Sequence, residues 1–295
     1  MSKVKFCFIM IVYNSDYVLG ECLRSALPFG PMLVTEGPCG YWAEHPMKAD
    51  NTMDILEAHK DYGQGILQIK RGVWTEKDQM SNALMDKVPM GTTHVFVVDA
   101  DEVWRERDLK YIEQMISLKD YDSMDFVADS FFGGFDHILT GFERDFPVTR
   151  IQRWYPGAVW KTHRPPTIEV LRGSRTTMKD LIHASVKDTL SAHITMPHYS
   201  YVFPSQAEMK HIYYSHYQPG ITIPDYVERV FLPWMRGNDA EKQAIESIWD
   251  GVHNFIPTYR KSCRTMPFNG EHPEEIQKSM PELRKRLQQE LDARA

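Results

Sequence analysis

The chain has 295 residues, which at roughly 150 residues per domain predicts one large or two small domains. Its composition, 42% hydrophobic and 25% charged, is globular and excludes wholesale disorder. Its 34 basic and 40 acidic residues give a net charge of −6, which excludes a protein that coats nucleic acid by bulk charge alone. It has no run of 18 apolar residues, so we expect no transmembrane helix.

The N-terminus and the cysteines indicate the compartment. Two lysines precede an apolar run over residues 6–12, but Tyr13 and Asn14 follow instead of a small-residue cleavage site, so we expect a buried strand rather than a signal peptide. The four cysteines have no CxxC spacing, which favours reduced thiols over disulfides or a zinc cluster. We therefore expect a cytoplasmic protein.

The first third of the chain alternates strand and helix signals. In chain order we expect a strand over residues 6–12, a helix over 17–26, a strand over 32–34, a loop over 37–48, a helix over 52–59, a strand over 66–69, a helix over 75–88 and a strand over 94–98. Repeated strand–helix units predict a parallel sheet with helices on both faces.

The pattern changes after residue 101. We expect a helix over residues 107–117, aromatic-rich strands over 123–132, 148–155 and 190–202, a helical stretch from 205 and a charged helix over 273–295. The predicted fold class is therefore α/β, with a central, mostly parallel sheet flanked by helices and a helical C-terminal region.

Polar residues follow each strand of the first third. They are Tyr13-Asn14, Thr35-Glu36, Arg71-Gly72 and Asp99 to Glu102. In parallel sheets, ligands bind beyond the carboxyl ends of the strands. The sequence therefore predicts that the four clusters converge on one site.

The fourth cluster holds two carboxylates, Asp99 and Asp101. In an extended chain residues i and i+2 point to the same side, where two carboxylates repel each other unless a positive charge lies between them. A hard divalent cation, Mg²⁺ or Mn²⁺, is the usual partner of such oxygen ligands. The alternative is a polar turn that carries two acidic residues by chance.

Five segments together resemble the family 2 glycosyltransferases. Residues 8–14, 32–37, 50–56, 77–84 and 95–102 follow, in order, that family's pattern of an apolar strand ending in Tyr-Asn, a strand ending in an acidic residue, a helix start, an Asn-Ala helix and a strand ending in Asp-x-Asp. The resemblance covers residues 4–105, with weaker similarity to residue 217. It implies a Rossmann-like GT-A fold that binds a nucleotide-sugar.

The resemblance also implies roles for residues of this chain. Tyr13 and Glu36 would lie around the nucleoside, with Glu36 standing where the family usually has an aspartate. Asp99 would lie near the ribose or the metal, and Asp101 would ligate a metal that also binds the donor diphosphate.

Lys77 and Asn82 would, by the same resemblance, sit near the nucleotide. The residues themselves leave a second interpretation open for each. Lys77 is equally consistent with a solvated lysine in the first turn of a helix, and Asn82 with a helix residue that bonds the neighbouring loop.

Two residues of a later segment are further candidates. Several family members have a downstream histidine that completes the metal site, and His198 is similarly placed. A histidine ligand would favour Mn²⁺ over Mg²⁺, whereas the alternative is a half-buried histidine in an aromatic patch. Lys210 either neutralises the departing diphosphate or lies along a helix surface.

A general base is also required, because the acceptor hydroxyl must lose its proton during attack on the sugar. In one subgroup of the family, His-Glu follows an Arg-x-x-Arg strand, but here Arg164 follows His163. We rank Glu169 and His163 first as catalytic base. The remaining candidates are Asp136, Glu143 and Asp145.

Two other functions fit parts of the sequence. Residues 95–103 also match the motif of haloacid-dehalogenase-like phosphotransferases, in which Asp99 would be the nucleophile and Asp101 the general acid/base. That motif belongs near the start of its domain, whereas 94 residues precede this strand region. A non-catalytic sugar-binding protein that kept the GT-A fold is the other alternative.

We therefore expect a metal-dependent glycosyltransferase that moves a sugar from a UDP-sugar to an acceptor hydroxyl, with inversion implied by the resemblance alone. The nucleotide-sugar-binding half is expected over residues 1–105, the acceptor half of the same domain over 106–204, and a helical region over 205–295. The acceptor stays open between an envelope glycan, a protein, a small molecule and a modified DNA base. The oligomeric state also stays open.

Overall fold

The computed structural model describes residues 3–62, 66–162, 167–170, 182–217, 222–249 and 263–294, apart from the side chains of residues 142, 143, 162 and 167–170. The chain divides into two compact units. Unit 1 consists of residues 1–127, 147–196 and 273–275, and unit 2 of residues 128–146, 197–272 and 276–295. Among the described helices, none has the length and apolar character needed to cross a membrane.

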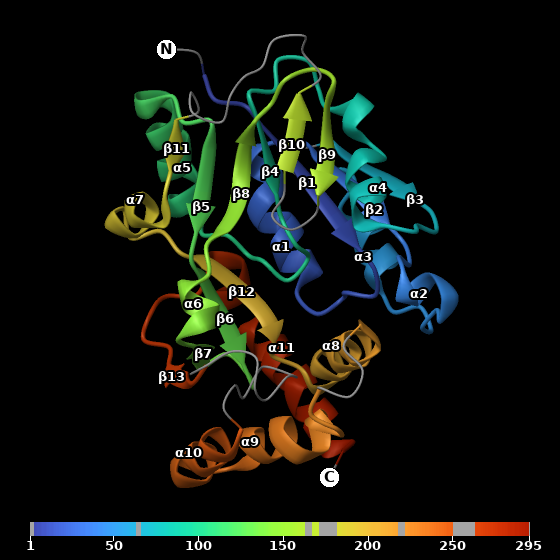
Figure 1. Ribbon diagram of the computed structural model, residues 1–295, viewed down its shortest axis with the longest axis vertical. Helices are drawn as coiled ribbons and strands as arrows, with labels where there is room; N and C mark the ends of the chain where they lie inside the picture. The colour runs from blue at the N-terminus through green and yellow to red at the C-terminus, as the bar shows by residue number, and fades with distance from the viewer. Residues whose placement is uncertain are drawn as a thin grey trace. The chain divides into compact units, whose positions relative to one another are not determined.

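Unit 1 is built on a seven-stranded sheet (Figure 1). In sheet order the strands are β11 (His183–Ala184), β5 (Ser123–Phe126), β8 (Val148–Arg153), β4 (His94–Val97), β1 (Phe6–Val12), β2 (Met32–Glu36) and β3 (Leu67–Arg71). β4, β1, β2 and β3 are parallel, β11 is parallel to β5, and β8 is antiparallel to both of its neighbours. The predicted α/β fold class with a mostly parallel sheet is confirmed.

Helices lie between these strands, and one more follows β11. They are α1 (Leu19–Ala26), α2 (Tyr41–Glu44), α3 (Thr52–Ala58), α4 (Lys77–Asn82), α5 (Glu106–Lys119) and α7 (Val186–Ser191). The helix expected over residues 75–88 is wrong in length, because α4 ends at Asn82 and a separate 3₁₀ turn follows over Met85–Lys87. The loop expected over residues 37–48 contains α2.

Successive side chains of β1 point to opposite faces of the sheet. On one face Phe6 and Phe8 both contact the ring of Phe96 in β4, with ring centroids 5.6 and 5.2 Å apart. Trp104, which is 1% exposed, lies edge-on to Phe96 at 5.0 Å. Since burying one such side chain is worth about 1.5–3 kcal/mol, this aromatic layer fixes the centre of the sheet.

The opposite face of β1 packs against two later segments. Ile9 of β1 and Val95 of β4 form a buried cluster with Met85 of the 3₁₀ turn and with Trp160. Trp160 lies on β9 (Ala158–Thr162), which pairs antiparallel with β10 (Thr167–Val170) in a two-stranded sheet of their own. This hairpin is therefore held to the large sheet by side chains.

Unit 2 contains a four-stranded sheet and most of the C-terminal helices. The strand order is β12 (Met196–Tyr201), β6 (Ala128–Phe132), β7 (His137–Leu139) and β13 (Thr265–Pro267). The helices are α6 (Phe142–Asp145), α8 (Pro204–Tyr217), a π-helical turn (Val227–Phe231), α9 (Leu232–Arg236), α10 (Asp239–Ile248) and α11 (Glu274–Asp292). Phe132 of β6 packs edge-on against both Phe231 and Trp234, which makes them the centre of the core of unit 2.

Two expectations for this part of the chain are wrong. The strand expected over residues 190–202 begins only at Met196, because Ser185 and Asp188 form a capping box that starts α7 and carries Leu190 into a helix. The helical stretch expected from residue 205 is interrupted by β13, whose three residues are too few to show a strand periodicity.

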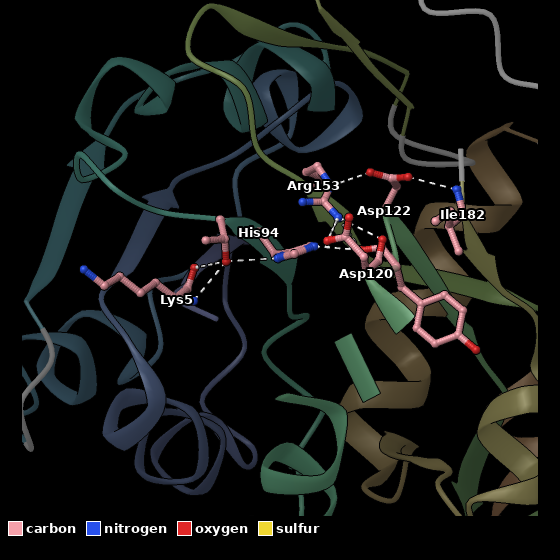
Figure 2. A network of polar contacts seen from close by, with 8 residues as sticks. Lys5, His94, Asp120, Asp122, Arg153 and Ile182 are labelled. Atoms are coloured by element: carbon pink, nitrogen blue, oxygen red, sulfur yellow. Dashed lines mark hydrogen bonds and ion pairs between the residues drawn. The ribbon is translucent and has the colours of Figure 1, made fainter. Parts of the chain in front are cut away.

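At the end of the sheet where β4 begins, a network of polar contacts joins several segments (Figure 2). Its central residue is His94, which is 2% exposed. Its Nε2 lies 2.9 Å from the carbonyl oxygen of Tyr121, and because a carbonyl only accepts, Nε2 carries the proton. Its Nδ1 lies 3.0 Å from the hydroxyl of Thr93, which in turn accepts from the backbone N–H of Lys5. Burial lowers the pKa of His94, and the hydrogen bond to Tyr121 only partly opposes this shift.

Arg153 at the end of β8 closes the same network (Figure 2). Its guanidinium donates to the carboxylates of Asp120, at 2.7 Å, and Asp122. Asp122 also accepts the backbone N–H of Ile182 at 2.8 Å. Arg153 thus has a structural role at the edge where the parallel strands start.

Candidate functional site

The predicted convergence of polar clusters is confirmed for the parallel strands. Val12 at the end of β1 is in register with Glu36 at the end of β2, and Glu36 is in register with Arg71 at the end of β3. β4 lies on the other side of β1, with Val97 in register with Ile9. The carboxyl ends of these strands therefore share one edge of the sheet, which is where such folds bind ligands.

The loop that follows β1 is joined to residues 47–52. The hydroxyl of Tyr13 accepts from the backbone N–H of Met47 at 2.8 Å, and Asn14 donates from Nδ2 to the carbonyl of Lys48 at 2.8 Å. Asn14 is 7% exposed with φ at +43°, a left-handed conformation that asparagine tolerates better than most residues. The Tyr13 ring is consequently fixed in position at the strand end.

Glu36 ends β2 with a side chain that is 9% exposed. Its Oε2 accepts from Nε of Arg71 at 3.0 Å, so neighbouring strand ends supply both members of the ion pair. The backbones that follow β2 and β3 also lie close together. Gly37 has φ at +137°, and a Cβ there would lie 1.9 Å from the carbonyl oxygen of Gly72. Only glycine fits at residue 37.

The acidic segment after β4 is a turn rather than an extended strand. The backbone N–H of Glu102 donates to the carbonyl of Asp99 at 3.0 Å, which closes a four-residue turn. The same-side argument for Asp99 and Asp101 therefore does not apply, because it requires an extended chain. The reason is that β4 ends at Val97, one residue earlier than expected.

A positive charge does lie between two carboxylates of this turn, and it belongs to Arg150. Nη2 of Arg150 lies 2.7 Å from Oδ2 of Asp99 and also donates to Oε1 of Glu102. The side chains of Arg150 and Glu102 are 9% and 0% exposed, respectively. Burial alone would lower the pKa of Arg150, but the two carboxylates outweigh it and raise that pKa. The guanidinium is therefore permanently charged.

The surroundings of the turn restrict which groups could hold a metal. Within the described ranges, no group of three or more His, Cys, Asp or Glu side chains is arranged to bind an ion. Asp101 is partly exposed. Cys22 is buried, and this burial raises the pKa of its thiol, as do the nearby charges of Glu102, Asp101 and Asp99. Mg²⁺ commonly binds one or two carboxylates together with substrate phosphates, and a partly exposed Asp101 suits that mode.

The two residues of α4 behave differently. Lys77 begins the helix and is half-buried. Burial raises the pKa of Cys39, and the positive charge of Lys77 partly opposes that increase. Lys77 thus lies close to the loop that follows β2. Asn82 ends the helix, and its carboxamide bonds both backbone groups of Trp160, at 2.8 and 2.7 Å.

An aromatic group lies beside Tyr13 and was not among the predicted site residues. The ring of Trp42 lies 6.4 Å from that of Tyr13, and Tyr41 lies between Trp42 and His45, at 4.9 and 4.6 Å. Tyr13, Tyr41 and Trp42 are partly buried, and Tyr41 and Trp42 lie on α2, within the expected loop. The consecutive aromatic residues at 41 and 42 were the available signal.

His198 and Lys210 belong to unit 2, whereas Asp99 and Asp101 belong to unit 1. Nδ1 of His198, on β12, lies 3.2 Å from the hydroxyl of Ser130 on β6. The ammonium group of Lys210, on α8, donates to the hydroxyl of Ser200 and lies 4.7 Å from the centre of the Tyr201 ring.

The candidate bases are described to different extents. His163 lies outside the described residues, and Glu169 is placed only through its backbone in β10, in register with Val159 of β9. In unit 2, Asp136 accepts from Arg284 at 2.6 Å, and this hydrogen bond lowers the pKa of Asp136. Asp145 ends α6 and is exposed.

Comparisons with known proteins give similarity of fold only. No protein-family model and no curated protein sequence matches the chain. Among solved structures, the chain is similar to S. aureus TarS 1-349 in complex with UDP-GlcNAc, with 18% identity over 45% of this chain and 36% of that chain and a TM-score of 0.35. It is also similar to 4-diphosphocytidyl-2C-methyl-D-erythritolsynthase from Anaerococcus prevotii, with 13% identity over 50% and 67% of the two chains and a TM-score of 0.29. The chain thus matches about a third of the length of that TarS structure.

Proposed function

We propose that the protein is a metal-dependent glycosyltransferase that transfers a sugar from a UDP-sugar to an acceptor hydroxyl. The observation that carries this proposal is the shared edge of unit 1, at which Glu36 ends one parallel strand and Tyr13 and the turn from Asp99 to Glu102 follow two others. By their resemblance to family 2 glycosyltransferases, these positions would contact the nucleoside and the diphosphate.

The donor-side residues would divide the work of binding. The Tyr13 ring, anchored through its hydroxyl, offers an aromatic surface to the base, and Glu36 offers carboxylate oxygens as acceptors. Asp101 would hold the cation, with His198 as a further ligand, and Lys77 and Lys210 would lie near the phosphates. A divalent cation bound there would stabilise the negative charge that builds on the diphosphate as the glycosidic bond breaks.

The acceptor side would supply the base. Glu169 of β10 or His163 would take the proton of the acceptor hydroxyl as its oxygen attacks the anomeric carbon in line with the departing diphosphate, which inverts that carbon. The nucleotide-sugar half would then end near residue 105 and the acceptor half near residue 204, with a helical region over 205–295. The acceptor class is not part of this proposal.

A panel of nucleotide sugars with Mn²⁺ or with EDTA tests the function. A ligand that binds the folded protein raises its melting temperature, so we expect an upward shift with one UDP-sugar and Mn²⁺, and a smaller shift with EDTA. UDP-GlcNAc is a suitable first member of the panel. If no nucleotide sugar shifts the melting temperature, and phosphate is instead released from a phosphomonoester, the glycosyltransferase proposal is wrong and a phosphotransferase replaces it.

A further inference from the structure

Asn82 pairs with Trp160 as a residue of a neighbouring strand would. Nδ2 of Asn82 donates to the carbonyl oxygen of Trp160 at 2.8 Å, and Oδ1 accepts from its backbone N–H at 2.7 Å. Along its opposite edge β9 pairs with β10, where Trp160 is in register with Ile168. The carboxamide therefore caps the edge of β9 that faces α4.

This pair of hydrogen bonds has few substitutes. In the described part of the chain, β9 and β10 pair with each other and with no strand of the seven-stranded sheet. A second attachment is the indole of Trp160, which is 4% exposed and packs against Ile9, Met85 and Val95. Dispersion contacts are non-directional, so packing of an apolar ring holds β9 against the core better than it fixes the position of β9 along the sheet. The hydrogen bonds of Asn82 set the position of β9 along the sheet.

The hairpin carries the first-ranked base. Glu169 on β10 is in register with Val159, the residue before Trp160 on β9. Any shift of Trp160 therefore moves the backbone of Glu169 with it. A misplacement of about 1 Å at a reacting group can cost about 10²-fold in rate.

We propose that Asn82 is a positioning residue for sugar transfer, an inference that rests on the proposed function. It holds the acceptor-side hairpin in register with the donor-side helix α4, and it is not a ligand of the nucleotide. This assigns Asn82 a role different from the one implied by its resemblance to family 2 glycosyltransferases. The helix end at which the family's Asn-Ala pair stands would thus couple the two halves of the reaction.

The test compares Asn82→Ala with the matched control Ser81→Ala. Within the described residues, the hydroxyl of Ser81 bonds the carbonyl of Lys77 in the same helix. Three quantities are measured: UDP affinity with Mn²⁺, hydrogen exchange of the Trp160 amide, and the ratio of sugar transfer to glycerol over release of free sugar by water. The UDP-sugar with the largest thermal shift serves as donor, and glycerol is the hydroxyl probe.

For Asn82→Ala we expect UDP affinity within about twofold of wild type, exchange of the Trp160 amide faster by about tenfold or more, and a transfer-to-hydrolysis ratio lower by about tenfold. Asn82→Asp keeps the acceptor for the Trp160 N–H but loses the donor, so it should fall between Asn82→Ala and wild type. Ser81→Ala should resemble wild type in all three measurements.

Two results would overturn the inference. A loss of UDP affinity with unchanged exchange would make Asn82 a nucleotide ligand, and faster exchange with an unchanged transfer ratio would make the hydrogen bonds purely structural. Failure of the proposed function looks different, because wild type itself would then bind no UDP. In that case unchanged exchange of the Trp160 amide in ligand-free Asn82→Ala would refute the hydrogen-bonded attachment of β9 to Asn82, and faster exchange would confine the role of Asn82 to holding the hairpin.

Discussion

The guanidinium of Arg150 lies 2.7 Å from the carboxylate of Asp99 and at the same time contacts that of Glu102. One buried cation thus neutralises two of the three acidic side chains that follow β4. Asp101, the third, is partly exposed, as is Asp99, whose side chain is 30% exposed, whereas the Glu102 side chain is fully buried. The turn therefore holds one fully buried carboxylate and two that solvent reaches.

Arg150→Met should destabilise the protein strongly. Removing one partner of a buried ion pair leaves an uncompensated charge and costs about 3–5 kcal/mol in the free energy of unfolding. Urea unfolding at pH 7 measures this loss. The matched double variant Arg150→Met with Glu102→Gln removes one of the stranded carboxylates and should recover part of the stability. A loss below about 1 kcal/mol for the single variant, the range of surface pairs, would mean that the ion pairs are not buried.

Asp101→Asn should weaken metal-dependent nucleotide binding while leaving the fold intact. The amide keeps the shape of the side chain but removes its negative charge, so we expect UDP affinity in the presence of Mn²⁺ to fall by about tenfold or more. Titration calorimetry with and without EDTA measures it. Equal UDP affinity of wild type in Mn²⁺ and in EDTA would refute the role of the metal.

His198→Ala separates a ligand from a packing residue. If His198 completes the metal site, the variant should lose affinity for UDP with Mn²⁺ and keep its melting temperature. If the residue only packs in unit 2, the melting temperature should fall and the affinity of the folded protein should stay the same. Ser130→Ala removes the hydroxyl that lies 3.2 Å from Nδ1 and serves as the control for the hydrogen bond alone.

Glu169→Gln and His163→Ala should leave UDP binding near that of wild type and slow sugar transfer. General base catalysis is worth about 10² to 10⁴-fold, so the true base should lose activity in that range. Initial rates of transfer, with UDP affinity measured in parallel, decide between them. If neither variant slows transfer by about tenfold, Asp145 and Glu143 become the next candidates, since Asp136 is engaged by Arg284.

Local patterns predicted the framework of unit 1. The apolar run over residues 6–12 became β1 because a strand buried on both faces needs no alternation, and its register with β2 brought Val12 and Glu36 to one edge. Such features depend on neighbours in sequence and on the parallel order of βα units. They could be predicted because each is carried by a short, local stretch of sequence.

The chemistry of the turn could not be predicted in the same way. The partner of Asp99 is Arg150, 51 residues later, and the contact arises only because β8 returns antiparallel beside β4. The carboxamide of Asn82 likewise finds Trp160, 78 residues away, through the placement of the hairpin. Contacts of this kind depend on tertiary packing, which residue spacing does not contain.

His94→Gln should make stability less dependent on pH. Burial lowers the pKa of His94 in the folded protein, whereas the unfolded value is about 6.5, so the unfolded chain binds more protons as pH falls below that value. The wild-type free energy of unfolding should therefore decrease from about pH 6.5 down toward the folded pKa. Urea midpoints between pH 7.5 and pH 5 measure it, and about equal slopes for wild type and His94→Gln would contradict the assignment.

β3 ends the seven-stranded sheet in the described part of the chain, and a strand at such a position can recruit a strand from another molecule. Its last two residues, Lys70 and Arg71, are both exposed and positively charged. Charges on an outermost strand make edge-to-edge pairing of two sheets unfavourable. Such pairing would bring like charges together and remove their bound water. The strand end that supplies Arg71 to Glu36 therefore also protects concentrated protein against self-association through this strand.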